Sequence, residues 1–197
     1  MSAFLSCPEL SAQRIVLKPV ESSDAHDFYE LWTSDGLSVS GGFEKPGDLD
    51  AVVNSLNYFK NLNASGFYFK WSIRLCDTNE FLGELECYPL KPQIRPWMEW
   101  GLGYSLKKSA WGQGFMSEAL ARLLHFAFAE SVIIRLKADV STHNARSYRL
   151  LKKVGFLEEG IQSAKNFSNG QFNDMTLMAF TRERYLQEQQ ALRAELG

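Results

Sequence analysis

The chain has 197 residues, with 21 Lys and Arg residues against 23 Asp and Glu residues, and its formal net charge of -2 argues against a general nucleic-acid binder. Hydrophobic residues make up 45% of the sequence and no long Pro- or Ser-rich linker interrupts it, so we expect a single domain over residues 1–197. The three cysteines, Cys7, Cys76 and Cys87, show neither an even disulfide framework nor metal-ligand spacing, and no apolar run is long enough to span a bilayer, which predicts a cytoplasmic protein without a bound metal.

The first half of the chain contains both strand-like and helix-like segments. The predicted elements are, in order, a strand at Arg14–Val20, a helix from about Ser23 to Trp32, a helix at Asp48–Leu62, and strands at Phe67–Leu75 and Phe81–Tyr88. Ser22 or Ser23 is expected to cap the first helix. The last two strands form a hairpin around residues 77–80, and Glu84 and Glu86 alternate with apolar residues in its second strand. Both carboxylates should therefore face the same side of the sheet.

The second half of the chain also contains both kinds of segment. Its predicted elements are a strand at Trp100–Leu106, an amphipathic helix after Gly114, a strand at Val132–Val140, a helix after Asn144, a hairpin of Phe156–Gln162 and Gln171–Phe180, and a helix from about Arg182 to Glu195. Asn144 is the expected N-cap of its helix, and Gly155 follows the last turn. On this helix Ser147 shares a face with Leu151 and Val154, so we expect a buried hydroxyl. Its partner would be a carbonyl of the preceding turn or a ligand.

The segment Trp111-Gly112-Gln113-Gly114-Phe115-Met116-Ser117 opens directly onto the amphipathic helix. The first turn of a helix presents unpaired N–H groups and partial positive charge, and glycines let a phosphate approach the backbone closely. The segment lacks the Gly-Lys-Ser/Thr ending of a nucleotide P-loop. A dinucleotide-binding turn fits it weakly, because residues 107–111 separate the glycines from the preceding strand. A turn that binds another phosphate ligand and a glycine-assisted turn without a ligand are the other interpretations.

Three blocks of the sequence resemble the GNAT acyltransferase superfamily, and specifically its RimJ/RimL-like ribosomal-protein N-acetyltransferase branch. They are Gly-Tyr-x-Leu at Gly103–Leu106, Trp-Gly-Gln-Gly-x-Met-x-Glu-Ala at Trp111–Ala119, and Asn-x-x-Ser followed by Lys-x-Gly-Phe within Asn144–Phe156. The blocks occur in the family's order and at its spacing, and weaker similarity extends from residue 14 to residue 174. The resemblance implies a mixed α+β fold, with a strongly bent, mostly antiparallel sheet and helices on both faces.

The resemblance also implies that the glycine turn holds the pyrophosphate of acetyl-coenzyme A (acetyl-CoA) through backbone N–H groups. The residues implied in coenzyme binding are Tyr104, Leu106, Trp111, Gly112, Gln113, Gly114, Phe115, Met116, Asn144 and Ser147. Trp111 and Met116 depart from the superfamily's Gln/Arg-x-x-Gly-x-Gly/Ala signature, and Met116 is compatible with binding if its side chain points into the core. Candidate partners for the coenzyme's 3′-phosphate are Lys107, Lys108 and the basic residues within 146–153.

Acetyl transfer needs few groups, because a deprotonated amine can attack the thioester directly and expel a thiolate without a metal or a covalent intermediate. The resemblance implies that Ser147 donates a hydrogen bond to that thiolate, and Tyr148 is a secondary candidate. The base should be a carboxylate, or a water held by one, for which Glu86 and Glu99 are candidates alongside Glu84. Each of these glutamates could equally be a solvated strand residue.

These motifs leave the acceptor amine open. The resembling branch includes enzymes that acetylate protein N-termini, whereas relatives act on polyamines, aminoglycosides or amino-acid-like amines. We expect a protein N-terminal α-amine, with loops 36–46 and 91–96 shaping its pocket. A small-amine acetyltransferase, a non-catalytic acyl-CoA-binding module and a nicotinamide-dependent oxidoreductase are the alternatives. Cys87 has no His near it in the sequence and is expected to pack as a small apolar residue. The expected assembly is a monomer or homodimer, without nucleic-acid or membrane partners.

Overall fold

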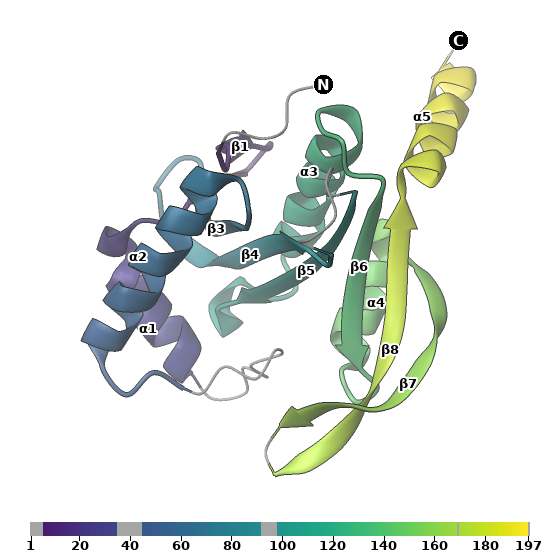
Figure 1. Cartoon of the computed structure of the whole chain (residues 1–197). Coiled ribbons are helices and arrows are strands. Elements are labelled where there is room, and N and C mark those ends of the chain that lie inside the picture. The colour runs from purple at the N-terminus through teal and green to yellow at the C-terminus, as the bar shows by residue number, and fades with distance from the viewer. Residues whose placement is uncertain (1–5, 35–44, 92–97, 169, 197) are drawn as a thin grey trace. The chain divides into compact units, whose positions relative to one another are not determined.

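The computed structural model describes residues 6–34, 45–91, 98–168 and 170–196 (Figure 1). The chain folds into two compact units. The N-terminal unit comprises Ser2–Tyr88 and Leu102–Arg122, and the C-terminal unit comprises Pro89–Gly101 and Leu123–Gly197. Strand β5 (Glu99–Leu106) and helix α3 (Phe115–Ala129) each contribute residues to both units.

Four antiparallel strands precede β5, and all of their residues except Pro89 belong to the N-terminal unit: β1 (Leu10–Ser11), β2 (Ile15–Pro19), β3 (Phe69–Leu75) and β4 (Phe81–Pro89). Between β2 and β3 the chain forms a 3-10 helix (Ser22–Asp24) and two neighbouring α-helices, α1 (Ala25–Thr33) and α2 (Leu49–Ser65) (Figure 1). The buried positions recur at helical spacing, including Phe28 and Leu31 on α1 and Leu56 and Phe59 on α2. Together with Phe81 of β4 these side chains form one hydrophobic core.

Three strands of the C-terminal unit pair in antiparallel fashion: β6 (Arg135–Ser141), β7 (Leu157–Ser168) and β8 (Gln171–Thr181). The long β7–β8 hairpin is followed by α5 (Arg182–Leu196), and α4 (Ala145–Val154) lies between β6 and β7 in the sequence (Figure 1). Phe180 of β8 packs against Phe128 of α3 and against Phe156, with ring centroids 5.7 Å and 5.6 Å apart. This aromatic group connects the second half of α3 to Phe156, which lies directly before β7.

The hydrogen-bonded strand order is β1-β2-β3-β4-β5-β6-β8-β7. β5 pairs in parallel with β6 through residues 99–101, which belong to the C-terminal unit. The pairs β1–β2, β2–β3, β3–β4, β6–β8 and β7–β8 are antiparallel. The predicted mixed α and β fold with a mostly antiparallel sheet is therefore confirmed.

The serine cap predicted for the first helix is wrong. Ser22 and Ser23 lie inside the 3-10 helix, and Asp24, in helical conformation, is the residue that precedes α1. The side chains of Glu21 and Asp24 form a reciprocal capping box on the 3-10 helix instead. The extra turn therefore moves the start of the α-helix to Ala25.

Some strands begin or end at other residues than predicted, because pairing with a neighbouring strand sets their length. β6 begins at Arg135 rather than Val132, and β7 continues to Ser168 rather than ending near Gln162. The register of β7 against β8 shifts between Gln162 and Asn166. The residues of β7 after this shift therefore pair with β8 in a different register from the residues before it. β1 has only two residues, too few to produce a periodic signal in the sequence.

Both predicted ends of α4 are confirmed. Asn144 Oδ1 accepts a hydrogen bond from Ser147 N at 3.0 Å, and Gly155 follows the helix with φ 106°. The Gly155 N–H donates to the carbonyl of Leu151, and a Cβ atom at Gly155 would lie 2.7 Å from Phe180 Cε2. Glycine is required here by both the left-handed backbone and the aromatic ring beside it.

Replacing Gly155 with alanine should lower the free energy of unfolding by about 1–3 kcal/mol, because the new methyl group meets Phe180 in a strained backbone conformation. Urea denaturation would measure the change. Gly47→Ala is the matched control, since no atom lies within 4 Å of its added Cβ, and it should change stability by less than about 0.5 kcal/mol. Equal losses in the two variants would contradict this account of Gly155.

Candidate active site

The turn before α3 is exposed and has a backbone conformation that favours glycine. Gly112 has φ 75° and Gly114 has φ 83°, both in the left-handed region. The carbonyl of Gly114 accepts the first helical hydrogen bond, from Glu118 N at 3.0 Å. The N–H groups of the helix's first turn therefore have no intrahelical acceptors. Together with the exposed glycine backbone they are suited to bind an anion such as a pyrophosphate.

The bulky residues around this turn are held by the protein. Phe115 and Met116 are buried, so Met116 meets the condition under which it is compatible with binding. Trp111 Nε1 donates a hydrogen bond to the carbonyl of Leu106 at 2.9 Å, which ties the turn to the end of β5. Tyr104, two residues earlier on that strand, is half-buried. These contacts leave the glycine backbone as the accessible part of the turn.

Arg14, immediately before β2, forms hydrogen bonds that stabilise the turn before α3. Its backbone N–H and its Nε donate to the two carboxylate oxygens of Glu118, at 2.6 Å and 2.8 Å. Its Nη1 donates to the carbonyl of Gln113 at 3.1 Å, and its guanidinium lies 4.6 Å from the centre of the Phe115 ring. The start of α3 is thus fixed to a segment about a hundred residues earlier in the chain.

Glu84 and Glu86 share one face of β4, as predicted, and a buried lysine connects them. Lys70 Nζ lies 2.7 Å from Glu84 Oε2 and 2.6 Å from Glu86 Oε2. The register explains this geometry, because Lys70 stands directly opposite Glu86 and Glu84 stands opposite Ser72, two residues along β3. The side chains of Glu84 and Glu86 are only 12% and 16% exposed, so neither is the solvated strand residue that the sequence also allowed.

Further groups hold the two carboxylates in place. Trp32 Nε1 donates to Glu84 at 3.2 Å, and Ser105 Oγ donates to the same carboxylate at 2.9 Å. Glu86 lies against Gly103, where an added Cβ would come within 2.8 Å of Glu86 Oε1. The glycine of the Gly-Tyr-x-Leu block therefore leaves room for the carboxylate of Glu86.

The electrostatics of this cluster favour charged Lys70. Burial by itself lowers the pKa of the Lys70 ammonium, but the charges of Glu84 and Glu86 and their hydrogen bonds to it outweigh burial and raise that pKa above its ordinary value. Burial, with a further contribution from the nearby charge of Glu86, raises the pKa of the Tyr68 phenol, which therefore stays protonated. Asn63 of α2 fixes the Lys70 backbone by accepting from its N–H at 2.9 Å and donating to its carbonyl at 3.0 Å.

In the C-terminal unit, Ser147 occupies the first turn of α4. Its N–H is bound by the Asn144 side chain, and the residue is only partly buried, so the expectation of a buried hydroxyl is wrong. Leu151, one turn later, is the buried residue of this helix. Tyr148 Oη donates to Glu158 at 2.8 Å, and this hydrogen bond raises the pKa of the phenol.

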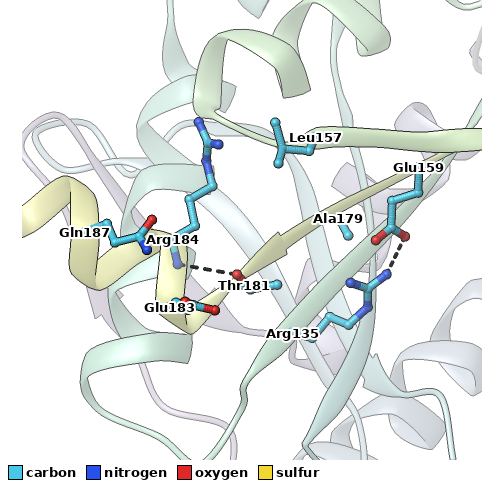
Figure 2. A pocket seen from close by; sticks show the side chains of 8 residues that line it. All are labelled: Arg135, Leu157, Glu159, Ala179, Thr181, Glu183, Arg184 and Gln187. Atoms are coloured by element: carbon cyan, nitrogen blue, oxygen red, sulfur yellow. Dashed lines mark hydrogen bonds and ion pairs between the residues drawn. The ribbon is translucent and has the colours of Figure 1, made fainter.

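Glu99, the other candidate base, belongs to an ion-pair network. Arg135 Nε lies 3.1 Å from Glu99 Oε1, and Lys91 Nζ lies 3.4 Å from Glu99 Oε2. Figure 2 shows Arg135 also bridging to Glu159, at the edge of a shallow cavity on β6, β7, β8 and α5. Arg184 lines the same cavity, and its backbone N–H donates to Thr181.

The three cysteines differ in environment. Cys7 and Cys87 are buried, whereas Cys76 is exposed. Burial raises the pKa of the Cys87 thiol well above its usual range, and burial likewise raises that of Cys7. The prediction that Cys87 packs as a small apolar residue is confirmed, because an unionised, buried thiol is a poor nucleophile.

Some predicted features fall outside the described residues, namely most of the two loops expected to shape the acceptor pocket, at 35–44 and 92–97. Lys107, a candidate partner of a phosphate, forms an ion pair with Glu30 at 3.0 Å. Within the described part of the chain no group of three or more His, Cys, Asp or Glu side chains is placed to hold a metal ion. The helices described there are not both long and apolar enough to cross a membrane.

Sequence reasoning missed Lys70 and Arg14. Lys70 lies in a strand whose other residues are largely apolar, and only its position opposite Glu86 shows that it belongs to the carboxylate cluster. Arg14 comes just before a strand, and its distance in sequence from Glu118 gives no sign of their contact. The pairing of β3 with β4 was predicted as a hairpin, so the Lys70–Glu86 contact could have been found by assigning its register.

The chain belongs to the GNAT acetyltransferase family, because the family's Acetyltransferase (GNAT) domain matches residues 14–157. It is similar to an uncharacterized N-acetyltransferase, YoaA, of Bacillus subtilis, with 25% identity over 177 residues that cover 90% of this chain and 98% of that protein. This places the protein in the class of N-acetyltransferases.

Solved structures share the fold. The chain superimposes with a TM-score of 0.77 and 20% identity on RimL, a ribosomal L7/L12 alpha-N-protein acetyltransferase in complex with coenzyme A, covering 90% of this chain and 99% of that one. It superimposes with a TM-score of 0.75 and 18% identity on spermidine N-acetyltransferase from Vibrio cholerae in complex with coenzyme A and spermine, covering 88% of this chain and 98% of that one. The first is named for a protein acceptor and the second for a polyamine.

Iodoacetamide at about pH 8 should modify native protein at Cys76 alone, because the raised pKa values of Cys7 and Cys87 keep both buried thiols protonated. Intact-mass and peptide-mapping measurements would count the adducts, and Cys76→Ser should abolish labelling. Labelling of native Cys87 at a rate similar to that of Cys76 would contradict the assignment of Cys87 as a packed, unreactive residue.

Proposed function

We propose that this protein transfers the acetyl group of acetyl-CoA to the N-terminal α-amine of a protein. The observation that carries the proposal is the exposed turn at Gly112–Gly114, whose left-handed glycines lead into the free N–H groups of α3. Gly114 has φ 83°, a backbone conformation that residues with a side chain rarely adopt, so the shape of this turn depends on glycine. The coenzyme complexes of RimL and spermidine N-acetyltransferase support a coenzyme site in this fold.

The residues of the site can support direct transfer in a ternary complex. Acetyl-CoA supplies the acetyl thioester. Glu86 would accept the proton of the attacking amine, directly or through a water, and Glu84 would assist it from the same face of β4. The nitrogen would then bond to the carbonyl carbon while the carbon–sulfur bond breaks. Ser147 would donate a hydrogen bond to the departing thiolate from the first turn of α4.

Two other candidate residues are less suited to these roles. The carboxylate of Glu99 is paired with Arg135 and Lys91, which fits a structural role at the start of β5. The Tyr148 hydroxyl donates its hydrogen bond to Glu158, so Ser147 is the better hydrogen-bond donor to the thiolate. We therefore assign the role of base to Glu86 and the hydrogen bond to the departing thiolate to Ser147.

The contacts of Glu84 and Glu86 with Lys70 favour an α-amine as acceptor. An α-amino group has an ordinary pKa of about 8, whereas a lysine-like primary amine has one of about 10.4, so the α-amine loses its proton far more readily near neutral pH. Glu84 and Glu86 already accept hydrogen bonds from Lys70, and a base engaged in this way suits the acceptor that is easier to deprotonate. A small polyamine is the alternative, since the fold is shared with spermidine N-acetyltransferase.

The proposal also covers the domain extent, the assembly and the cellular location of the protein. We propose that the chain acts as one catalytic domain over residues 1–197, as a monomer or homodimer, and that no metal takes part. Free cysteines at positions 7, 76 and 87 suit a reducing compartment, which supports a cytoplasmic location.

Thiol release from acetyl-CoA, measured against N-terminal peptides, polyamines and aminoglycosides, tests the proposed function. Turnover should require an amine and be fastest with a peptide that has a free N-terminus. Ser147→Ala should lower kcat at least about tenfold through loss of the thiolate's hydrogen-bond donor. Tyr148→Phe tests the other candidate hydrogen-bond donor to the thiolate. This variant should keep turnover within about twofold of wild type, because the hydroxyl that it removes contacts Glu158.

Other outcomes would select among the alternatives. Saturable coenzyme A binding by calorimetry without turnover on any amine would indicate a non-catalytic binding module. Preferred turnover of spermidine would identify a polyamine acetyltransferase. Thermal stabilisation by a nicotinamide dinucleotide and not by coenzyme A would overturn the proposal and favour an oxidoreductase.

A further inference from the structure

The surroundings of Lys70 are those of a binding site for a primary ammonium ion. Its side chain is 4% exposed and contacts two carboxylates, at 2.7 Å and 2.6 Å. Its Nζ also lies 4.7 Å from the ring centre of Phe59 and 5.5 Å from that of Trp32. Carboxylates together with aromatic faces are the groups that recognise ligand ammonium ions. Here the protein fills that position with its own side chain.

Lys70 is held at this position by both its backbone and its side chain. Asn63 binds the N–H and the carbonyl of Lys70 from α2, and the Lys70 carbonyl also accepts from Val20 N at 3.1 Å. The raised pKa of Lys70 keeps the ammonium charged. Backbone hydrogen bonds and charge contacts therefore both hold Lys70 in the cluster.

The net charge of Lys70, Glu84 and Glu86 affects which acceptor amines can bind beside them. Ionised Glu84 and Glu86 carry two negative charges, and Lys70 cancels one of them while using a hydrogen-bond acceptor on each. A polyamine bears a second ammonium in addition to the reacting nitrogen, and that second charge would gain most from two uncompensated carboxylates. An α-amine without a second cation close to it loses little binding energy when Lys70 neutralises one of the two carboxylate charges.

We propose that Lys70 determines acceptor specificity: its ammonium occupies the cation position between Glu84 and Glu86 and thereby selects against amines that carry a second ammonium. Lys70 acts through the two carboxylates and is a positioning residue. This inference rests on the proposed function, since it assigns the acceptor side of the reaction to the Glu84–Glu86 face of β4. Its chemistry concerns binding alone and adds no step to acetyl transfer.

The test compares Lys70→Met with Arg74→Met. Arg74 is the matched control because it lies on the same face of β3, is buried, and bridges Asp24 and Asp27, each at 2.8 Å. Both variants lose one buried cation that joins two carboxylates, but only Lys70→Met changes the charge at Glu84 and Glu86. Any loss of stability that follows from an unpaired buried carboxylate should therefore occur in both.

Two measurements are made on each folded variant. The first is the ratio of kcat/KM for spermidine to kcat/KM for an N-terminal peptide, which should rise at least about tenfold in Lys70→Met, mainly through a lower KM for spermidine. The second is calorimetric binding of spermidine without an acetyl donor, which should tighten by a similar factor. Arg74→Met should keep the wild-type values within about twofold, and Lys70→Arg, which retains the charge, should stay closer to wild type than Lys70→Met does.

The outcomes separate this inference from the proposed function. An unchanged spermidine ratio and unchanged spermidine binding in folded Lys70→Met would overturn it, as would an equal gain in Arg74→Met. If Lys70→Met does not fold, Lys70→Gln, which keeps polar contacts without charge, carries the same expectation. Tighter spermidine binding in a protein that turns over no amine would support the role of Lys70 while refuting the proposed transferase reaction.

Discussion

The contact on which the candidate site depends is the buried ion triad of Lys70, Glu84 and Glu86. Two carboxylates on one face of β4 repel each other and lose solvation when buried, so they require a counter-charge. The antiparallel register supplies it from directly across the sheet, at 2.6 Å from Glu86 and 2.7 Å from Glu84. Trp32 and Ser105 then donate hydrogen bonds to the carboxylate of Glu84 that this ion triad holds in place.

The turn before α3 depends on a different constraint, the backbone conformation of two glycines. Gly112 and Gly114 adopt left-handed φ angles that most residues avoid, and the turn they form ends where α3 begins. Such a turn has little intrinsic rigidity. Arg14 supplies it by binding both Glu118 and the carbonyl of Gln113, so a distant segment of the N-terminal unit fixes the orientation of the helix end. The geometry of this turn is thus a tertiary property built on a local sequence motif.

The groups that carry the proposed chemistry lie on short, well-supported elements in each unit. Glu86 stands on a strand beside Gly103, whose missing side chain leaves space for the carboxylate. Ser147 stands in the first turn of a helix that is fixed at one end by Asn144 and ended at the other by Gly155. In both places a small or capping residue of the family motifs has a structural function that can be stated independently of catalysis. This is why the motifs predicted the local structure as well as the family.

The sequence by itself determined the family, the mixed α and β fold and the local features that follow from short-range chemistry. The two glycines before α3, both ends of α4 and the shared face of Glu84 and Glu86 were all predictable, because turns, caps and strand alternation depend on neighbouring residues. Only the tertiary structure decided which side chains meet. Lys70 reaches Glu84 through strand register, and Arg14 reaches Glu118 across 104 positions of sequence. These long-range contacts decide which charges are compensated, and charge compensation is the property on which the proposed choice of acceptor amine rests.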